Sequence, residues 1–325
     1  MLKRGYDPSI ATGTICASGT LGQIIPPSII LVMLGDVLSS AYQQAQLDMG
    51  IFSPETLSVG DLFIGAIIPG LLLVSLYILY LLLMAAIKPE SMPPIPKSER
   101  QNDETSLRHQ VIKELLPPLI LIFVVLGSII GGFATPTEAA AVGAMGAIIL
   151  AIIRKQFTLQ ILREVMQSTT RVSSMVFMIL IGASVFSLVF RGFHGDDLVQ
   201  ELLSDLPGGT FGALFVVMLF MFLLGFVLDF IEITFVVVPI VGPILLAMGI
   251  DPIWLGIMIA INLQTSFLTP PFGFALFYLR GVAPASIRTM DIYKGVVPFI
   301  AIQILALAMI AWWPELATWL PQKIM

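Results

Sequence analysis

Charge is scarce in this sequence. Only 11% of the 325 residues are Asp, Glu, Lys or Arg, whereas a soluble domain carries roughly 25%. Hydrophobic residues make up 57% of the chain, and its mean hydropathy is +0.98. This composition excludes an ordinary soluble globular protein and indicates a chain that lies in a membrane over most of its length.

Cysteine and histidine are nearly absent, with one Cys and two His. Cys16 cannot form a disulfide within the chain, and His109 and His194 lie in charged loops, apart from any other metal-ligating cluster. The H-E-x-x-H motif of zinc proteases is missing. An intramembrane aspartyl dyad would need a second buried Asp on another helix. The sequence therefore predicts that the protein is not an enzyme and holds no cofactor.

Long apolar segments dominate what is present. A helix needs roughly 20 residues to cross a membrane. The apolar segments are 9–35, 62–87, 115–133, 136–153, 172–190, 211–228, 233–248, 253–279 and 292–313. One hydrophilic linker, 88–114, interrupts them and carries several prolines and alternating charges. The sequence predicts an all-α polytopic membrane protein.

One pattern occurs twice at the same spacing. Gly5-Tyr6-Asp7-Pro8 leads to Pro26-Pro27, and Gly249-Ile250-Asp251-Pro252, 244 residues later, leads to Pro270-Pro271. A double proline inside an apolar segment removes backbone donors where no water can replace them. Two such breaks at matching positions of two halves indicate a secondary transporter with discontinuous helices.

The placement of Lys and Arg predicts how the copies are oriented. If the Lys3/Arg4 end is cytoplasmic, the acidic stretch 36–61 is outside and the basic linker is inside. If 209–248 forms a re-entrant hairpin, the second Gly-x-Asp-Pro begins outside. The two copies then run in opposite directions, as an inverted-topology repeat.

The repeat also predicts the domain organisation. The first repeat, 1–87, contains a broken helix 8–36 and a complete helix 61–87, and the linker 88–114 follows. The second repeat, 115–325, contains helices over 115–190, an outer arm helix 195–206, the hairpin 209–248, a broken helix 252–280 and a final helix 291–313. A hairpin precedes the second Gly-x-Asp-Pro, but only four residues precede Gly5. We therefore expect this chain to lack the first hairpin.

Polar residues cluster beside both breaks, in Ser18 to Gln23 and in Asn262 to Thr269. Carbonyls freed by a Pro-Pro break, together with neutral hydroxyl oxygens, suit Na⁺. The half-helices that start at Ser28 and Phe272 direct positive N-terminal ends into the same gap and favour an anion. The alternative is that these small residues only let helices pack closely. Asp229, at the hairpin tip, is a candidate to face a bound cation, or else is solvated at an interface.

The motifs together resemble a known family. Gly5-Tyr6-Asp7-Pro8, Ile25-Pro26-Pro27-Ser28, Gly132-Phe133-Ala134-Thr135-Pro136-Thr137-Glu138-Ala139-Ala140 and the stretch from Asn262 to Gly273 resemble the large membrane subunit (DctM-like) of tripartite ATP-independent periplasmic (TRAP) transporters. The resemblance implies an elevator-type secondary transporter of the bacterial inner membrane. It would use Na⁺ as coupling ion to import a small organic anion of carboxylate type across the lipid bilayer.

The resemblance also implies partners and site residues. The partners are a small membrane subunit (DctQ-like) and a periplasmic substrate-binding protein, with no nucleic acid. A first, partial Na⁺ site is assigned to Ser18, Gly19, Thr20, Gly22 and Pro26. A second Na⁺ site is assigned to Asp229, Asn262, Thr265, Ser266, Thr269 and Pro270, and the substrate anion to Ser28 and Gly273.

One alternative function stays open at this point. A proton-coupled transporter or a channel of another inverted-repeat family would show titratable pairs along a path. Only Asp229 and Glu232 qualify as such a pair.

Overall fold

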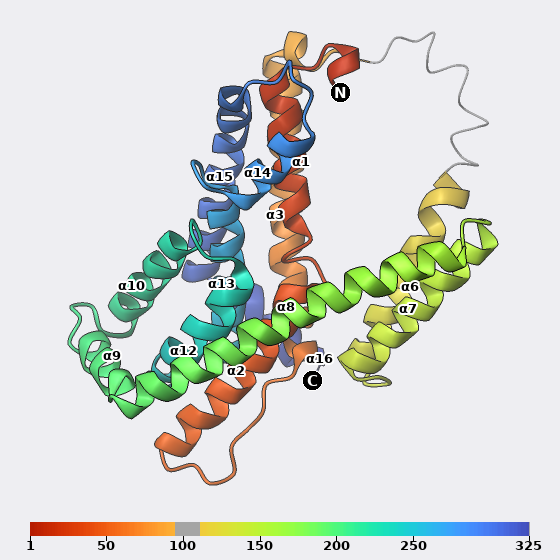
Figure 1. The fold of residues 1–325 in the computed structure, drawn as a ribbon. Helices are drawn as coiled ribbons and strands as arrows, with labels where there is room; N and C mark the ends of the chain where they lie inside the picture. Colours follow the sequence, from red (N-terminus) through yellow and green to blue (C-terminus); the bar gives the residue numbers. More distant parts are fainter. Residues whose placement is uncertain (95–110, 325) are drawn as a thin grey trace. The chain divides into compact units, whose positions relative to one another are not determined.

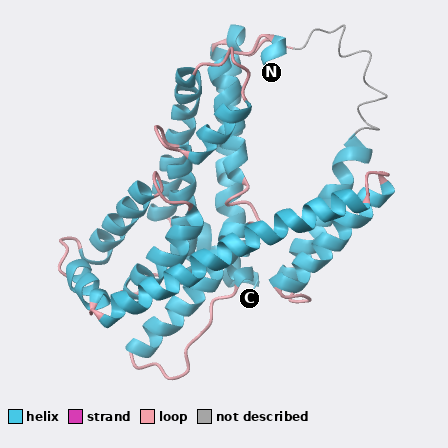
Figure 2. Cartoon of the chain, viewed as in Figure 1, coloured by secondary structure: helices cyan, strands magenta, loops and turns pink. Residues whose placement is uncertain are grey.

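The computed structural model describes residues 1–94 and 111–324, and every regular element in these ranges is helical (Figure 2). Six of the helices are long and apolar enough to cross a membrane. This confirms the predicted all-α polytopic membrane fold. The chain divides into two compact units, residues 1–92 with 179–325, and residues 93–178.

The first unit contains the first broken helix, formed by α1 (Pro8–Leu21) and α2 (Ile29–Asp48). The Asp7 carboxylate caps α1 by accepting from the backbone N–H groups of Ser9 and Ile10. The chain is non-helical through the Pro-Pro break and becomes helical again at Ile29. The helix α2 continues twelve residues beyond the end predicted at 36. Its buried residues Leu34, Val37, Leu38, Ala41 and Ala45 recur at helical spacing, so one apolar face extends past Asp36.

The second broken helix repeats this design with α13 (Pro252–Leu268) and α14 (Phe274–Val282). Asp251 caps α13 by accepting from the Trp254 N–H at 2.8 Å. The chain is again non-helical around Pro270 and Pro271. Both Pro-Pro peptide bonds are cis. Matching sequence signals thus produce matching local structure in the two copies.

A helical hairpin lies before the second broken helix. Its first arm is α10 (Gly209–Leu224), and its second arm consists of α11 (Phe230–Glu232), a π-helical turn (Ile233–Val237) and α12 (Val238–Ala247). Asp229 occupies the turn between the arms and caps α11. The short helix α9 (Gly195–Ser204) precedes the hairpin and packs against both arms.

Each broken helix is followed by a complete one, α3 (Val59–Ile87) or α15 (Thr289–Trp312). Both begin with a capping box whose acid is Asp61 or Asp291. A further helix, α16 (Glu315–Ile324), packs on α3. The hydropathy pattern did not predict α16, because it is short and amphipathic.

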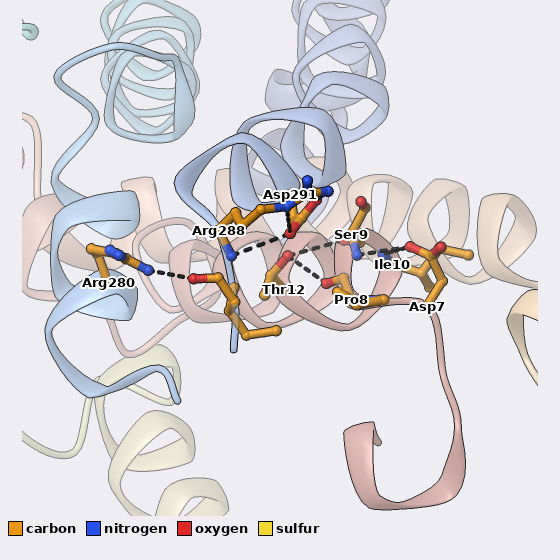
Figure 3. A network of polar contacts seen from close by, with 9 residues as sticks. Asp7, Pro8, Ser9, Ile10, Thr12, Arg280, Arg288 and Asp291 are labelled. Atoms are coloured by element: carbon orange, nitrogen blue, oxygen red, sulfur yellow. Dashed lines mark hydrogen bonds and ion pairs between the residues drawn. The ribbon is translucent and has the colours of Figure 1, made fainter. Parts of the chain in front are cut away.

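The first half of each broken helix packs against the complete helix of the other copy. Figure 3 shows the start of α1 beside the start of α15. A Cβ atom added at Gly13 would overlap the Gly295 carbonyl, and one added at Gly295 would overlap the Ser9 carbonyl. In the other pair, a Cβ at Gly65 would overlap the Ile253 side chain. Ser9 and Ile253 occupy the same position after their Gly-x-Asp-Pro motifs. Gly65 and Gly295 each lie four residues after the capping acid of the complete helix, so the two contacts are equivalent in the two copies.

The two broken helices run in opposite directions (Figure 1). Near its start, α13 meets the second half of α2, where a Cβ at Gly256 would touch Leu38. The later half of α1 meets the start of α14, where the Cys16 thiol donates to the Ala275 carbonyl at 3.7 Å. This antiparallel arrangement is consistent with an inverted-topology repeat.

The second unit contains α6 (Leu116–Ile130), α7 (Pro136–Ile153) and the first part of α8 (Leu159–Gly192). A π-helical turn (Val111–Leu115) precedes α6, and Arg154 pairs with Glu114 at 2.6 Å. Thr135 and Glu138 form the capping box of α7. The prediction assigned 115–190 to the second repeat; residues up to Met178 form a compact unit of their own, and Ile179 onward belongs to the first unit. Residues 95–110 of the predicted linker lie outside the described part of the chain.

Candidate functional site

A cavity of about 570 Å³ lies where both broken helices meet the hairpin tip. We call it the central cavity. Gly19, Thr20 and Gln23 line it from the first broken helix, Asp229 and Phe230 from the hairpin tip, and Phe267, Phe274 and Tyr278 from the second broken helix. Residues more than 200 positions apart thus line one open cavity.

The wall of the central cavity is largely apolar and aromatic, with few polar groups. The polar groups include the Thr20 hydroxyl, the Gln23 amide and the Asp229 carboxylate. Among the described residues that line the cavity, none is basic. Any anion held here would therefore depend on backbone N–H groups and neutral donors such as the Gln23 amide and the Tyr278 hydroxyl, and not on a Lys or Arg side chain.

The first predicted cluster is divided by the structure. Gly19 and Thr20 line the central cavity, while Ser18 and Gly22 are exposed and outside its lining. Thr20 is 4% exposed and donates to the Ala17 carbonyl at 2.9 Å. Pro26 is buried in the break.

Ser28 connects the two sides of the first break. Its hydroxyl donates to the Gln23 carbonyl oxygen and accepts from the Leu31 N–H. The side chain is buried and acts as the cap of α2. Its predicted role toward a substrate anion stays a prediction, and its hydroxyl is already occupied within the break.

The second predicted cluster is buried along α13. The Thr265 hydroxyl donates to the Ile261 carbonyl, and the Ser266 hydroxyl donates to the Leu263 carbonyl. The Thr269 hydroxyl donates to the Thr265 carbonyl. Each hydroxyl hydrogen is therefore used within the helix, and the oxygen lone pairs face outward as acceptors. Pro270 follows directly and is half-buried.

Asn262 connects α13 to the hairpin. Its Nδ2 donates to the Met218 carbonyl of α10 at 2.8 Å. Asn262 and Thr265 line a separate apolar cavity of about 560 Å³ between α10, α13 and α15. Asp229 does not line that cavity. The structure therefore places Asp229 at the central cavity and Asn262 at the separate apolar cavity.

Two residues to which the sequence analysis assigned no role, Gly225 and Gln264, lie in the same region. Gly225 ends the first arm of the hairpin, and a Cβ atom there would overlap the Ser266 hydroxyl. Gln264 is fully buried and its Nε2 donates to Thr20 Oγ1 at 3.4 Å. A glycine at the end of an apolar run was the available signal for Gly225. Gln264 could have been found by pairing it with Thr20 across the repeat.

The start of α14 faces the central cavity. Phe274 and Ala275, its first residues, line the wall. Gly273 is buried, its N–H donates to the Thr269 carbonyl, and a Cβ there would overlap the Phe267 carbonyl. Glycine is thus needed at 273 for close backbone approach.

Discontinuous helices, a re-entrant hairpin and a cavity at their junction together define a polytopic membrane transport protein. Residues 1–316 match the family described as tripartite ATP-independent periplasmic transporter, DctM component, and the chain belongs to that family. This confirms the predicted DctM-like large subunit. The relatives are named as transporter permeases, so the chain is a transport protein and not an enzyme.

Several relatives match almost the whole chain. The C4-dicarboxylate TRAP transporter large permease protein DctM of Vibrio cholerae is 31% identical, over all of this chain and 71% of the relative. The sialic acid TRAP transporter large permease protein SiaM of the same organism is 28% identical, over 98% of this chain and 68% of the relative. The ectoine TRAP transporter large permease protein TeaC of Halomonas elongata is 27% identical, over 98% of this chain and 69% of the relative. With six apolar helices, this membership identifies a multi-pass protein of the bacterial inner membrane.

Proposed function

We propose that this chain is the permease subunit of a Na⁺-coupled transporter that imports a small organic anion of carboxylate type. Large permeases of this family work with a small membrane subunit and a periplasmic binding protein, and we extend both partners to this chain. The central cavity carries the proposal, because residues beside both helix breaks and at the hairpin tip line the same cavity.

The acceptor chemistry beside the breaks supports Na⁺ as the coupling ion. The hydroxyl hydrogens of Thr20, Thr265, Ser266 and Thr269 all point to helix carbonyls. Their oxygens can therefore offer lone pairs, as can carbonyls freed at the breaks. Unwound backbone carbonyls coordinate Na⁺ in discontinuous-helix transporters. Asp229 adds a carboxylate on the cavity wall.

The start of α14 supports an anionic substrate. A helix N-terminus presents unpaired N–H groups and the positive end of the helix dipole. The nine-residue α14 begins at the wall of the central cavity. One relative is named for C4-dicarboxylates, which supports a carboxylate class.

An elevator movement is part of the proposal. Both broken helices and the hairpin belong to one compact unit, residues 1–92 with 179–325. Such a unit can carry an enclosed site across the membrane as one body. This unit would then include the parts that hold the ion and the substrate.

Uptake by the complete transporter in proteoliposomes tests the proposal. Labelled C4-dicarboxylates and monocarboxylates would be supplied with the binding protein, under an inward Na⁺ gradient or with choline replacing Na⁺. We expect uptake of at least one carboxylate only with the Na⁺ gradient. Uptake that persists in choline and follows a pH gradient would overturn Na⁺ coupling and favour the proton-coupled alternative.

A further inference from the structure

The repeat offset coincides with a side-chain contact at one buried pair. Gln264 and Thr20 are 244 residues apart, which is also the offset between the Gly-x-Asp-Pro motifs, and Gln264 Nε2 donates to Thr20 Oγ1. Equivalent residues of two copies related by a two-fold axis can touch only where both lie near that axis. The bond therefore marks the line about which the broken helices are related.

This bond connects two buried side chains. Thr20 is 4% exposed and Gln264 is 0% exposed. The Thr20 hydroxyl hydrogen is used on the Ala17 carbonyl, so Thr20 can only accept from Gln264. Within the described residues, Gln264 Oε1 has no hydrogen-bond partner. The Gln264 side chain is thus held by polar contact to the opposite copy.

The pair also connects the two groups of candidate ion ligands, because Thr20 belongs to the first group and Gln264 lies within the second cluster. Thr20 lines the central cavity and lies one turn before Gln23 and the first break. Gln264 is followed directly by Thr265 and Ser266 of the second cluster. A shift of α1 against α13 that repositions one cluster must therefore change this contact.

The bond length makes the contact sensitive to such a shift. The donor–acceptor distance is 3.4 Å, whereas N–H···O bonds centre near roughly 2.9–3.0 Å and weaken as they lengthen. A small displacement of one helix would either strengthen or break the bond. A displacement of α1 would therefore change the environment of Gln264 on α13, and a displacement of α13 would change that of Thr20.

We propose that the Thr20–Gln264 bond couples ion binding at the first broken helix to ion binding at the second. Gln264 is a positioning residue in this scheme: it holds the Thr20 hydroxyl in place and is not itself an ion ligand. The inference rests on the proposed function and deepens it, because it assigns the linkage between the two half-sites to one contact.

A double-mutant cycle on the complete transporter tests the coupling. Na⁺ dependence of uptake would be measured for wild type, Thr20→Val, Gln264→Met and the double variant. We expect each single change to raise the half-saturating Na⁺ concentration about fivefold and to lower the Hill coefficient from about 2 towards about 1. Thr20→Val also removes a candidate ion ligand, so the decisive comparison is between Thr20→Val and the double variant. Adding Gln264→Met to Thr20→Val should change the half-saturating Na⁺ concentration by less than about twofold, because the contact is already lost.

Gln303→Met provides the matched control. Gln303 is also 0% exposed, and its amide donates one hydrogen bond, to the Tyr77 hydroxyl. Like Gln264, it has no hydrogen-bond partner for its Oε1 among the described residues, but it lies on α15 and not on a broken helix. Its replacement should leave the Hill coefficient for Na⁺ at the wild-type value. Gln264→Met should lower that coefficient without lowering the thermal midpoint more than Gln303→Met does, which separates coupling from a structural role.

The two possible failures are distinguishable. Wild-type uptake that ignores Na⁺ would overturn the proposed function and this inference together. Wild-type uptake that depends on Na⁺, with an unchanged Hill coefficient in Gln264→Met or with additive effects in the double variant, would overturn the coupling role alone.

Discussion

Gly225, at the end of the first hairpin arm, lies so close to Ser266 on α13 that no side chain fits between them. The contact joins the hairpin tip to the polar cluster beside the second break. It explains why the turn needs glycine there although the φ angle of Gly225 is helical, at −64°.

Gly225→Ala is expected to separate the hairpin from α13. The added Cβ would overlap Ser266 Oγ, and overpacking of this kind costs about 1–3 kcal/mol. We expect a lower thermal midpoint and a higher half-saturating Na⁺ concentration for uptake. Adding Ser266→Gly removes both overlapping side-chain atoms and should recover part of the thermal midpoint. No recovery would contradict the contact as the cause.

Gly13→Ala is expected to disturb the packing of α1 on α15. The new Cβ would overlap the Gly295 carbonyl, and backbone cannot move aside as a flexible side chain does. We expect a loss of about 1–3 kcal/mol in stability, measured as a lower unfolding midpoint in detergent. Gly182→Ala is the control, because a Cβ on that helical glycine meets nothing within 4 Å. Equal midpoints for the two variants would contradict the close approach.

Asp229→Asn separates the charge of this side chain from its capping role. The amide oxygen can still accept from the Phe230 N–H, but the cavity loses its carboxylate. We expect the half-saturating Na⁺ concentration to rise about tenfold, since a coupling energy of 1–3 kcal/mol corresponds to roughly 5–150-fold.

Glu232→Gln is the companion to this change. Glu232 belongs to the same capping box, is half-buried and does not line the central cavity. Its Na⁺ dependence should stay within about twofold of wild type, because the amide oxygen can replace the carboxylate in the cap. If both variants shifted equally, the special role of Asp229 would be lost.

Tyr77→Phe is expected to destabilise the contact between α3 and α15. Tyr77 OH accepts from Gln303 Nε2 at 2.8 Å, and its ring packs edge-on against Phe299. Removing the hydroxyl leaves a buried amide unpaired, at a cost of about 1–3 kcal/mol. The double variant Tyr77→Phe/Gln303→Met should be more stable than Tyr77→Phe alone. Thermal unfolding of the three variants would show this ordering, and the reverse ordering would contradict it.

Local signals predicted the local structure well. Asp7 and Asp251 each precede Pro at the first helical position, a pattern typical of a helix start, and both cap their helices. Both double prolines interrupt helices, because a proline has no N–H to continue the ladder. The end predicted for the first broken helix was too early, since the acidic residues from Asp36 onward were interpreted as an outside stretch, whereas α2 continues to Asp48.

The candidate site was only partly predictable. The sequence placed Thr20 and the Thr265–Thr269 stretch beside the breaks, because those residues are neighbours of the prolines. It did not separate Asp229 from Asn262, which face different cavities. Gln264 lies inside the predicted Asn262–Thr269 cluster but was given no role, because its partner Thr20 is 244 residues away along the chain.

The sequence by itself determined the membrane class, the helix breaks and the family, since hydropathy, proline and capping act within a few residues along the chain. Tertiary structure alone decided which breaks share a cavity and which side chains meet across the repeat. Those relationships depend on close approach at positions without a side chain: Gly13 meets the backbone of Gly295, and Gly225 meets the side chain of Ser266.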